Sequence, residues 1–245
     1  MNKNNLIILI TGGVGILGRK MADYLHNQGN EIYVFDKIPK GGIESSFIKG
    51  LSGYFECDLS KPEEIEACFD ELIKQTKRID VLINNASVRQ FKNLGDFQTI
   101  DVSKNLSVDF IAPVILINLC LTIMKKNSFG RIISISSISA YRGYSKGSLY
   151  CSSKRALIAI NESLSKELKK FDGTITSNII CPGSFSKSDG TILLGKSFIT
   201  DSVLTKVNYI IHSKINGRTL NVFSFRYKLM ESLRFLKRAV QMLIR

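Results

Sequence analysis

The stretch Thr11-Gly12-Gly13-Val14-Gly15-Ile16-Leu17-Gly18 connects a short apolar run, Leu6–Thr11, to an amphipathic helical pattern over Ile16–Gln28. Glycines at such a junction permit a tight turn and let a ligand approach the backbone N–H groups closely. The N-terminus of the following helix favours a bound anion, because its free N–H groups and the positive end of its dipole face the turn. In this strand–turn–helix context, the pattern predicts a dinucleotide site. The residues expected at the pyrophosphate are Thr11, Gly12, Gly15, Ile16 and Gly18.

Beyond this turn, runs rich in branched residues alternate with longer helical patterns as far as about Gly183. The alternation predicts a parallel sheet with helices on both faces, the doubly wound α/β architecture of the Rossmann fold. The expected strands are Leu6–Thr11, Glu31–Asp36, Gly53–Asp58, Val81–Asn84, Arg131–Ser136, Thr174–Cys181 and, last, Gly217–Val222. The expected helices are Ile16–Gln28, one near Pro62–Ile73, and two long ones near Phe97–Lys125 and Ser148–Lys170. We expect a single domain over residues 1–226, followed by a helix over residues 227–245.

Two helices carry further local signals. Ser60 and Glu63 have the spacing of a capping box, and Pro62 suits the first turn of a helix. The longest apolar stretch, Phe110–Met124, is interrupted by Asn118 and is shorter than a membrane span requires. We interpret it as part of a buried helix.

An acidic residue, Asp36, ends the second expected strand. A carboxylate there accepts hydrogen bonds from the ribose hydroxyls of the adenosine and repels a 2′-phosphate. The sequence therefore favours NAD over NADP, although the adjacent Lys37 weakens this preference.

Tyr150 and Lys154 are four residues apart on an expected helix, so their polar ends can approach each other. A phenol is a weak base near neutral pH, and a neighbouring ammonium stabilises its phenolate form. Tyr150 could then exchange a proton with a substrate. Ser137 follows the fifth expected strand, and parallel sheets present ligand-binding groups at the carboxyl ends of their strands. These three residues are the candidate catalytic groups.

Together with the glycine turn, these residues resemble the short-chain dehydrogenase/reductase family from Leu6 to about Gly183. The matching elements are the turn Thr11–Gly18, Asp36, Asp58-Leu59, Asn84-Asn85-Ala86, Ser136-Ser137, Tyr150-x-x-x-Lys154 and Pro182-Gly183. The resemblance implies hydride transfer with a nicotinamide cofactor. It implies that Tyr150 transfers the proton, Lys154 binds the nicotinamide ribose and lowers the pKa of the catalytic phenol, and Ser137 positions the substrate oxygen.

The resemblance also assigns cofactor contacts outside the glycine turn. Asp58 and Leu59 correspond to the adenine side, Asn85 and Ala86 lie beside the cofactor, and Pro182 with Gly183 lie near the nicotinamide.

Several positions depart from the family pattern. The spacing Gly12, Gly15, Gly18 is similar to a longer branch that modifies sugar nucleotides, and Ser87 replaces the glycine that usually ends Asn-Asn-Ala-Gly. Asp109 stands where we expect the Asn of the family's proton relay, with Asn105 as a less well-spaced candidate. The Thr expected after Pro-Gly is absent, and Ser184, Ser186 and Ser188 are the possible substitutes.

The 245 residues include 34 Lys and Arg against 21 Asp and Glu, a formal net charge of +13, and 44% are hydrophobic. Such a composition predicts a globular protein with a sizeable core. Five scattered Cys and two His lack ligand spacing, so we expect neither a disulfide framework nor a metal site. The first residues lack the pattern of a signal peptide, and we expect a cytoplasmic protein.

The C-terminal quarter is strongly basic: from Lys187 onward there are 11 basic and three acidic residues. Tyr227–Arg245 repeats apolar residues at helical spacing, which predicts a basic amphipathic helix. The preferred alternative is that this helix packs in a homo-oligomer or on the protein's own core. The other is that it lies on the anionic inner face of a membrane. No recognised nucleic-acid-binding motif is present, so we expect no nucleic-acid partner.

The predicted activity interconverts a secondary alcohol and a ketone on a small-molecule substrate, with NAD favoured over NADP. The polar segment Ser184–Ile199 favours a carbohydrate-like substrate, and the basic tail suits the assembly of a surface polysaccharide. One alternative is a 3-oxoacyl-acyl-carrier-protein reductase, because acidic carrier proteins suit a basic surface. The other is a non-catalytic dinucleotide-binding scaffold or sensor, motivated by Asp109, by Ser87 and by the basic C-terminal segment, which replaces the acidic, glycine-ended C-terminus usual in the family.

Overall fold

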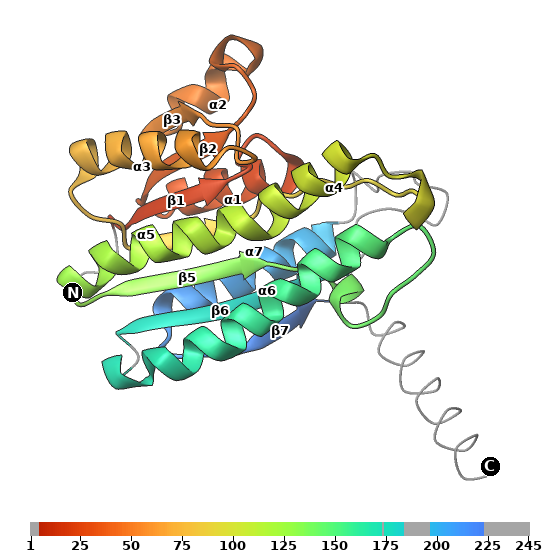
Figure 1. Ribbon diagram of the computed structural model, residues 1–245. Coiled ribbons are helices and arrows are strands. Elements are labelled where there is room, and N and C mark those ends of the chain that lie inside the picture. The colour runs from red at the N-terminus through yellow and green to blue at the C-terminus, as the bar shows by residue number, and fades with distance from the viewer. Residues whose placement is uncertain (1–4, 173, 184–196, 223–245) are drawn as a thin grey trace.

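Seven parallel strands form one sheet at the centre of the protein, in the order β3-β2-β1-β4-β5-β6-β7 (Figure 1). The computed structural model describes residues 5–172, 174–183 and 197–222. The strands are β1 (Ile7–Thr11), β2 (Glu31–Asp36), β3 (Gly53–Glu56), β4 (Val81–Asn84), β5 (Gly130–Ile135), β6 (Ile175–Pro182) and β7 (Thr219–Val222). The strand order reverses between β1 and β4, and in such sheets ligands bind at the carboxyl ends of the strands beside this point. The predicted doubly wound architecture is confirmed.

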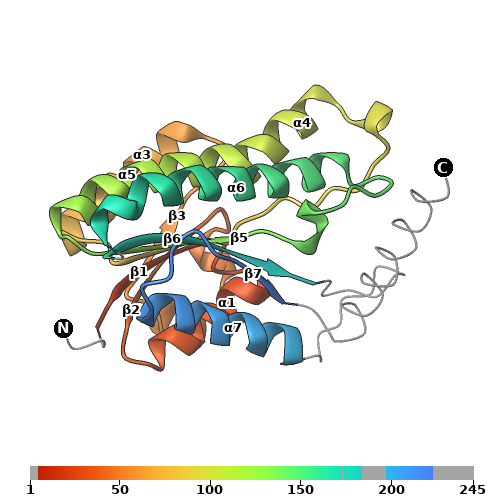
Figure 2. The ribbon, with the colours of Figure 1, turned by 90° about the horizontal axis from the view of Figure 1, so that it is seen from below.

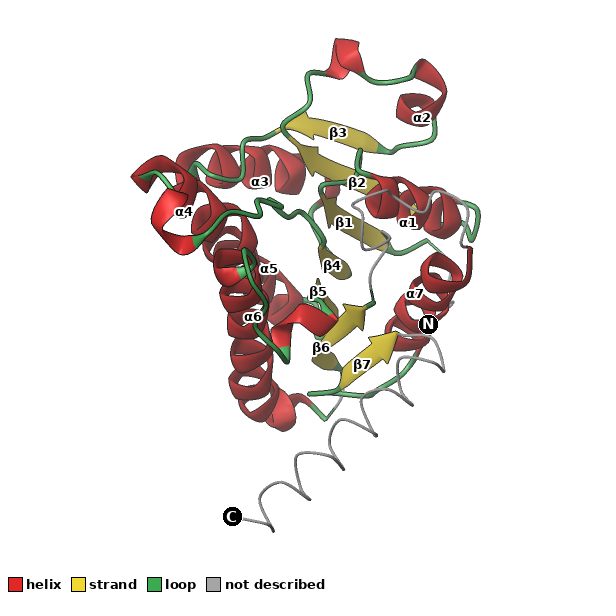
Figure 3. Ribbon diagram, turned by 90° about the vertical axis from the view of Figure 1, so that its right-hand side faces the viewer, coloured by secondary structure: helices red, strands yellow, loops and turns green. Residues whose placement is uncertain are grey.

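Helices cover both faces of the sheet (Figures 2 and 3). One face carries α1 (Ile16–His26) and α7 (Ser197–His212), and the other carries α3 (Pro62–Thr76), α4 (Thr99–Leu106), α5 (Ala112–Lys126) and α6 (Ser148–Glu167). A short helix, α2 (Ser45–Lys49), lies between β2 and β3. The right-handed crossovers that join parallel strands require such helices on the faces of the sheet.

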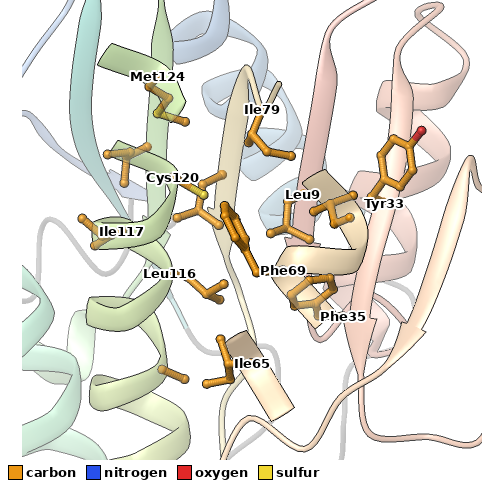
Figure 4. Packing of buried hydrophobic residues seen from close by; sticks show 14 of the residues in the cluster. Leu9, Tyr33, Phe35, Ile65, Phe69, Ile79, Leu116, Ile117, Cys120 and Met124 are labelled. Carbon is orange, nitrogen blue, oxygen red and sulfur yellow. The ribbon is translucent and has the colours of Figure 1, made fainter. Parts of the chain in front are cut away.

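The sheet is buried on both sides, which explains why its strands are continuous apolar runs. In β1, Leu9 packs with Phe69 of α3 and Leu116 of α5 in the cluster shown in Figure 4, while Ile8 and Ile10 belong to a second cluster with α1 and α7. Successive side chains of a strand point to opposite faces, so one short strand contributes to both cores. This double burial fixes the central strands, and with them the turns at their carboxyl ends.

The predicted capping box at the start of α3 is wrong. The residue that precedes this helix is Lys61, and its side chain makes no capping hydrogen bond. Ser60 instead donates its hydroxyl to the carboxylate of Asp58, and Glu64 accepts the backbone N–H of Asp58. Pro62 does occupy the first turn, as expected.

The helix expected over Phe97–Lys125 is interrupted. It consists of α4, a π-helical turn over Ser107–Ile111, and α5. The whole run Thr99–Lys126 is long and apolar enough to cross a membrane by composition alone. Leu116, Cys120 and Met124, however, are fully buried against the sheet, as expected for a core helix.

Helix α7 was not predicted. The helix expected over residues 227–245 and most of the polar segment Ser184–Ile199 lie outside the described residues.

Candidate active site

The turn between β1 and α1 is closed tightly enough to require glycine. Gly12 has a φ of +65°, a conformation that other residues rarely adopt, and a Cβ there would lie 2.8 Å from the Cα of Ala86. A Cβ on Gly18 would collide with the carbonyl oxygen of Gly12. Both glycines are therefore needed by the protein's own backbone, whatever ligand the turn holds.

Hydrogen bonds tie this turn to the segment after β4. The side-chain amide of Asn85 donates to the carbonyl oxygens of Thr11 and Gly12, at 2.9 and 3.0 Å. The hydroxyl oxygen of Thr11 accepts the backbone N–H groups of Asn85 and Ala86, at 3.0 and 3.1 Å. The structure thus places Thr11, Asn85 and Ala86 together, at the point where the strand order reverses.

The N-terminus of α1 has the properties of an anion site. Its first turn contains no acidic residue, and Gly15, which precedes it, provides no side-chain cap. The first N–H groups of the helix and its dipole are consequently available to a phosphate. Ile16 lies at this end of the helix with 51% of its surface exposed. The residues present therefore fit the pyrophosphate of a dinucleotide.

Asp36 ends β2 beside the glycine turn and is largely buried. One carboxylate oxygen accepts the backbone N–H of Val14 at 3.0 Å, and the other accepts that of Ile38 at 3.3 Å. The hydroxyl of Tyr54 donates to the carbonyl oxygens of Asp36 and Ile38, and burial raises the pKa of Tyr54. Asp36 is thus held at the place where the adenosine ribose of a dinucleotide is expected.

The residues expected on the adenine side follow β3. Burial of the Asp58 carboxyl acts to raise its pKa, but hydrogen bonds from Ser60 and the charges of Lys61 and Lys104 lower that pKa overall. Asp58 is therefore a carboxylate at neutral pH. Leu59 points into the core, with 7% of its surface exposed.

Tyr150 and Lys154 lie one turn apart near the start of α6. The ammonium nitrogen of Lys154 is 5.8 Å from the centre of the Tyr150 ring and donates to the carbonyl oxygen of Ile135, the last residue of β5, at 3.3 Å. Both residues are buried. The helix therefore brings a phenol and an ammonium together at the carboxyl end of the central strands.

Ser137 stands just beyond β5 and begins a short 3₁₀ turn, Ile138–Ala140, that packs against α6. Its hydroxyl oxygen accepts the backbone N–H of Ser139 at 3.1 Å and lies 3.1 Å from the Ser139 hydroxyl. Ser137 thus caps this turn on the same side of the sheet as Tyr150. The neighbouring Ser139 hydroxyl was not singled out from the sequence.

Asp109 lies in the π-helical turn and is fully buried. One carboxylate oxygen is 3.5 Å from the ammonium nitrogen of Lys154 and accepts the hydroxyl of Ser87 at 2.7 Å, and the other accepts the backbone N–H of Val88 at 2.6 Å. Asn105, the other candidate for the relay position, donates its side-chain amide to the carbonyl oxygen of Val88 at 3.1 Å. The structure therefore brings both candidates to the segment after β4, with Asp109 directly beside Lys154.

Pro182 ends β6, and the backbone N–H of Gly183 donates to the carbonyl oxygen of Val222 in β7, at 2.6 Å. Pro182 and Gly183 thus lie at the carboxyl end of β6. Ser184, Ser186 and Ser188, the substitutes for the missing Thr, lie outside the described residues.

Sequence reasoning missed Arg89 and Phe91, which follow β4 and lie against Tyr150. The Arg89 guanidinium is 5.9 Å from the centre of the Tyr150 ring, and the Phe91 ring contacts the same ring edge-on at 6.0 Å. Because neither residue belongs to a recognisable motif, only the fold reveals that they border the site.

The arrangement combines an anion-binding turn with a phenol, a hydroxyl and a paired ammonium at the same edge of the sheet. Comparisons with known proteins agree with this chemistry. A sequence model of the family described as short chain dehydrogenase matches residues 6–193. The 3-oxoacyl-[acyl-carrier-protein] reductase FabG of Rickettsia felis is 31% identical over 238 residues, which cover 87% of this chain and 93% of that protein.

Two solved structures share the fold. NAD+-bound xylitol dehydrogenase superposes with a TM-score of 0.77 at 19% identity, covering 91% of this chain and 99% of its own. A short chain dehydrogenase from Burkholderia cenocepacia in complex with NADP gives a TM-score of 0.78 at 23% identity, covering 91% and 98%.

Proposed function

Because the chain belongs to the short-chain dehydrogenase/reductase family, we propose that it uses NAD(H) to interconvert a secondary alcohol and a ketone on a small hydroxylated substrate. Members of this family are oxidoreductases that bind NAD or NADP and act on CH–OH groups. The observation that carries the proposal is the position of Tyr150, whose ring lies 5.8 Å from the ammonium nitrogen of Lys154 at the carboxyl end of β5.

Different residues of the chain would have different roles in this reaction. The turn from Thr11 to Gly18 and the N-terminus of α1 would bind the pyrophosphate of the cofactor, which when bound supplies or accepts the hydride. Tyr150 would donate a proton to the substrate oxygen during reduction and accept it during oxidation. The Ser137 hydroxyl would donate a hydrogen bond to the same oxygen, and the Lys154 ammonium would bind the ribose of the nicotinamide.

The preference for NAD over NADP rests on Asp36. Its carboxylate ends β2 beside the glycine turn, where the 2′-phosphate of NADP would meet a negative charge. The adjacent Lys37 opposes this repulsion.

The choice of a carbohydrate-like substrate, with a role in surface polysaccharide assembly, rests on sequence composition. Its support is the polar segment Ser184–Ile199 and the basic tail. Association into a homo-oligomer, a cytoplasmic location and membrane contact by residues 227–245 likewise rest on the sequence.

One alternative substrate has support of its own. The similarity to FabG of Rickettsia felis extends over 87% of this chain, which favours reduction of a 3-oxoacyl group on acyl carrier protein. A screen of keto and hydroxy compounds that includes sugar nucleotides and acyl thioesters would separate the two substrate classes.

Replacement of Tyr150 by Phe tests the reaction. Removing the hydroxyl eliminates the proton donor, so we expect turnover to fall by about a hundredfold or more, while the cofactor still binds. Absorbance of the reduced nicotinamide measures turnover, and protection against thermal unfolding by NADH measures binding.

The matched control is Tyr209→Phe, because Tyr209 is exposed on α7. Full activity of Tyr150→Phe would refute the proposed proton transfer. Cofactor binding without turnover of any compound by the wild-type protein would favour the scaffold.

A further inference from the structure

The segment after β4 places a cation at the edge of the catalytic site. Arg89 follows the Asn84-Asn85-Ala86 motif by three residues, and its guanidinium carbon is 5.9 Å from the centre of the Tyr150 ring and 5.9 Å from that of Phe91. These distances lie at the outer limit of a cation–π contact, which extends to about 6 Å from the ring centre. Arg89 thus lies beside the ring of the residue that would protonate the substrate oxygen.

The Arg89 side chain is exposed, and aromatic rings lie beside it. Phe91 contacts Tyr150 edge-on, with ring centres 6.0 Å apart, and contacts Tyr144 at 6.2 Å. Phe91 and Tyr144 are both substantially exposed, at 46% and 42%. Phe91 therefore contacts both Tyr150 and Arg89, and the Phe91 and Tyr144 rings remain accessible to a ligand.

Arg89 differs from Lys154 and Lys92 in its charge balance. Lys154 pairs with Asp109 at 3.5 Å, and Lys92 pairs with Asp101 at 2.7 Å. Within residues 5–172, 174–183 and 197–222, no carboxylate lies within salt-bridge distance of Arg89. The positive charge next to the catalytic phenol is therefore not neutralised by the described part of the chain.

We propose that Arg89 binds an anionic group of the substrate, and that the substrate is a keto or hydroxy acid, or a phosphorylated equivalent, with its anion close to the reacting carbon. A guanidinium presents two parallel N–H donors that match a carboxylate or phosphoryl group. This inference rests on the proposed reaction: a ketone carbon gains a hydride from the reduced cofactor, and its oxygen gains the proton of Tyr150. It specifies a free anion near the ketone, whereas the thioester of an acyl carrier protein is neutral at that position.

The test uses two pairs of ketones that differ in charge. Acetoacetate is compared with its neutral ethyl ester, and dihydroxyacetone phosphate with dihydroxyacetone, each at saturating NADH. The first pair identifies a carboxylate site and the second a phosphoryl site. In at least one pair we expect the wild-type enzyme to have a kcat/KM about tenfold or more higher for the anionic member.

Replacing Arg89 by Gln should lower kcat/KM for that anion by about tenfold to hundredfold, mainly through KM, and leave the neutral partner nearly unchanged. Arg89→Lys keeps the charge but loses the two-pronged geometry, so it should recover only part of the loss. The control is Lys166→Gln, which removes one positive charge near the other end of α6. Lys166 is about 24 Å from Tyr150 along the helix, at a rise of about 1.5 Å per residue. An equal effect of Arg89→Gln on both members, or a wild-type preference for both neutral members, would overturn the proposal.

A binding measurement separates this proposal from the proposed reaction. The thermal unfolding temperature of the NADH complex is measured with each anionic probe, for the wild type and for Arg89→Gln. Protection that requires Arg89, without any turnover, would support the anion site and refute the reaction. If neutral ketones are turned over only when Tyr150 is present, and Arg89→Gln changes neither turnover nor protection, the reaction would be supported and the anion site refuted. Absence of both protection and turnover would overturn the anion site.

Discussion

Asp109 and Lys154 form a charged pair that solvent hardly reaches, with side-chain exposures of 0% and 3%. The carboxylate also accepts the Ser87 hydroxyl and the Val88 N–H, so both of its oxygens are used. Charges removed from water to this extent are stable only when each has a partner. Asp109 therefore holds the Lys154 ammonium in place beside Tyr150 and joins α6 to the segment after β4.

Replacing Asp109 by Leu should destabilise the protein strongly. It leaves the Lys154 ammonium buried without a counter-charge and the Val88 N–H without an acceptor, so the free energy of unfolding should fall by about 3–5 kcal/mol. Asp109→Asn retains one acceptor oxygen and should lower the free energy of unfolding by a smaller amount. Urea unfolding of the variants without cofactor measures the change.

The double variant Asp109→Leu with Lys154→Met provides the control. It removes both charges, so it should be more stable than Asp109→Leu alone, and the double-mutant cycle isolates the pair. Additive effects of the two substitutions would show that the charges do not interact.

Between α4 and α5, the π-helical turn explains how Asp109 comes to face Lys154. Pro113 lies in the first turn of α5 and has no N–H, so it cannot donate to the carbonyl oxygen of Asp109 as an α-helix would require. The helix widens locally over Ser107–Ile111, and such turns often occur at functional sites. A regular helix over Phe97–Lys125 would have placed Asp109 differently relative to α6.

The junction between β3 and α3 should make the protein's stability depend on acid pH. The carboxyl oxygen of Asp58 accepts both the N–H and the hydroxyl of Ser60, and its pKa is lowered in the folded state. A lowered folded pKa stabilises the protein above the unfolded pKa of about 3.9, and this stabilisation disappears as the pH falls through the folded value.

Ser60→Ala should therefore reduce stability at neutral pH by about 1 kcal/mol or less, and the difference from the wild type should shrink below about pH 4. Urea unfolding over a pH series measures it, with exposed Ser163→Ala on α6 as the control. A difference that stays constant from neutral to acid pH would contradict the assigned role of the Asp58 carboxylate.

How far the sequence predicts these elements depends on whether a signal is local. Strand and helix alternation follows from apolar periodicity, so all seven strands were predicted to within a few residues. The π-helical turn before Pro113 was missed because, without the packing, a proline at the start of a helix looks like a proline within one. Helix α7, Ser197–His212, was missed because its first three residues were assigned to the polar segment Ser184–Ile199 and the rest was described only by the positive charge of the C-terminal quarter.

The residues of the candidate site likewise include some that local sequence motifs predict and some that only the fold reveals. Thr11, Asp36, Tyr150 and Lys154 lie in motifs whose spacing indicates one chemistry, and the structure brings them to one edge of the sheet. Arg89 and Phe91 depend on where the segment after β4 passes in space. No spacing rule relates Arg89 to Tyr150, which is about 60 residues later in the sequence.

For the molecule as a whole, cofactor binding should appear as a gain in stability. A ligand that binds only the folded state stabilises it by about 2.7 kcal/mol at a concentration one hundred times its Kd. Because the carboxylate of Asp36 repels a 2′-phosphate, we expect NADH to raise the thermal unfolding temperature more than NADPH at equal concentration. Differential scanning measurements with both cofactors test this preference.

Asp36→Ser should narrow or reverse the difference between the two cofactors, whereas Asp23→Asn, on the exposed side of α1, should leave it unchanged. Equal protection of the wild type by NADH and NADPH would contradict the proposed role of Asp36 in excluding a 2′-phosphate.

The order of the strands also has a consequence for biosynthesis. Every pairing in the sheet is parallel, and β1 acquires its second neighbour only when Val81 pairs beside Ile8. Contacts between such distant segments form slowly, because each requires a long loop to close first. The nascent chain must therefore carry β1 with one edge unpaired until β4 has left the ribosome, and chaperones that shield such an edge should increase its yield.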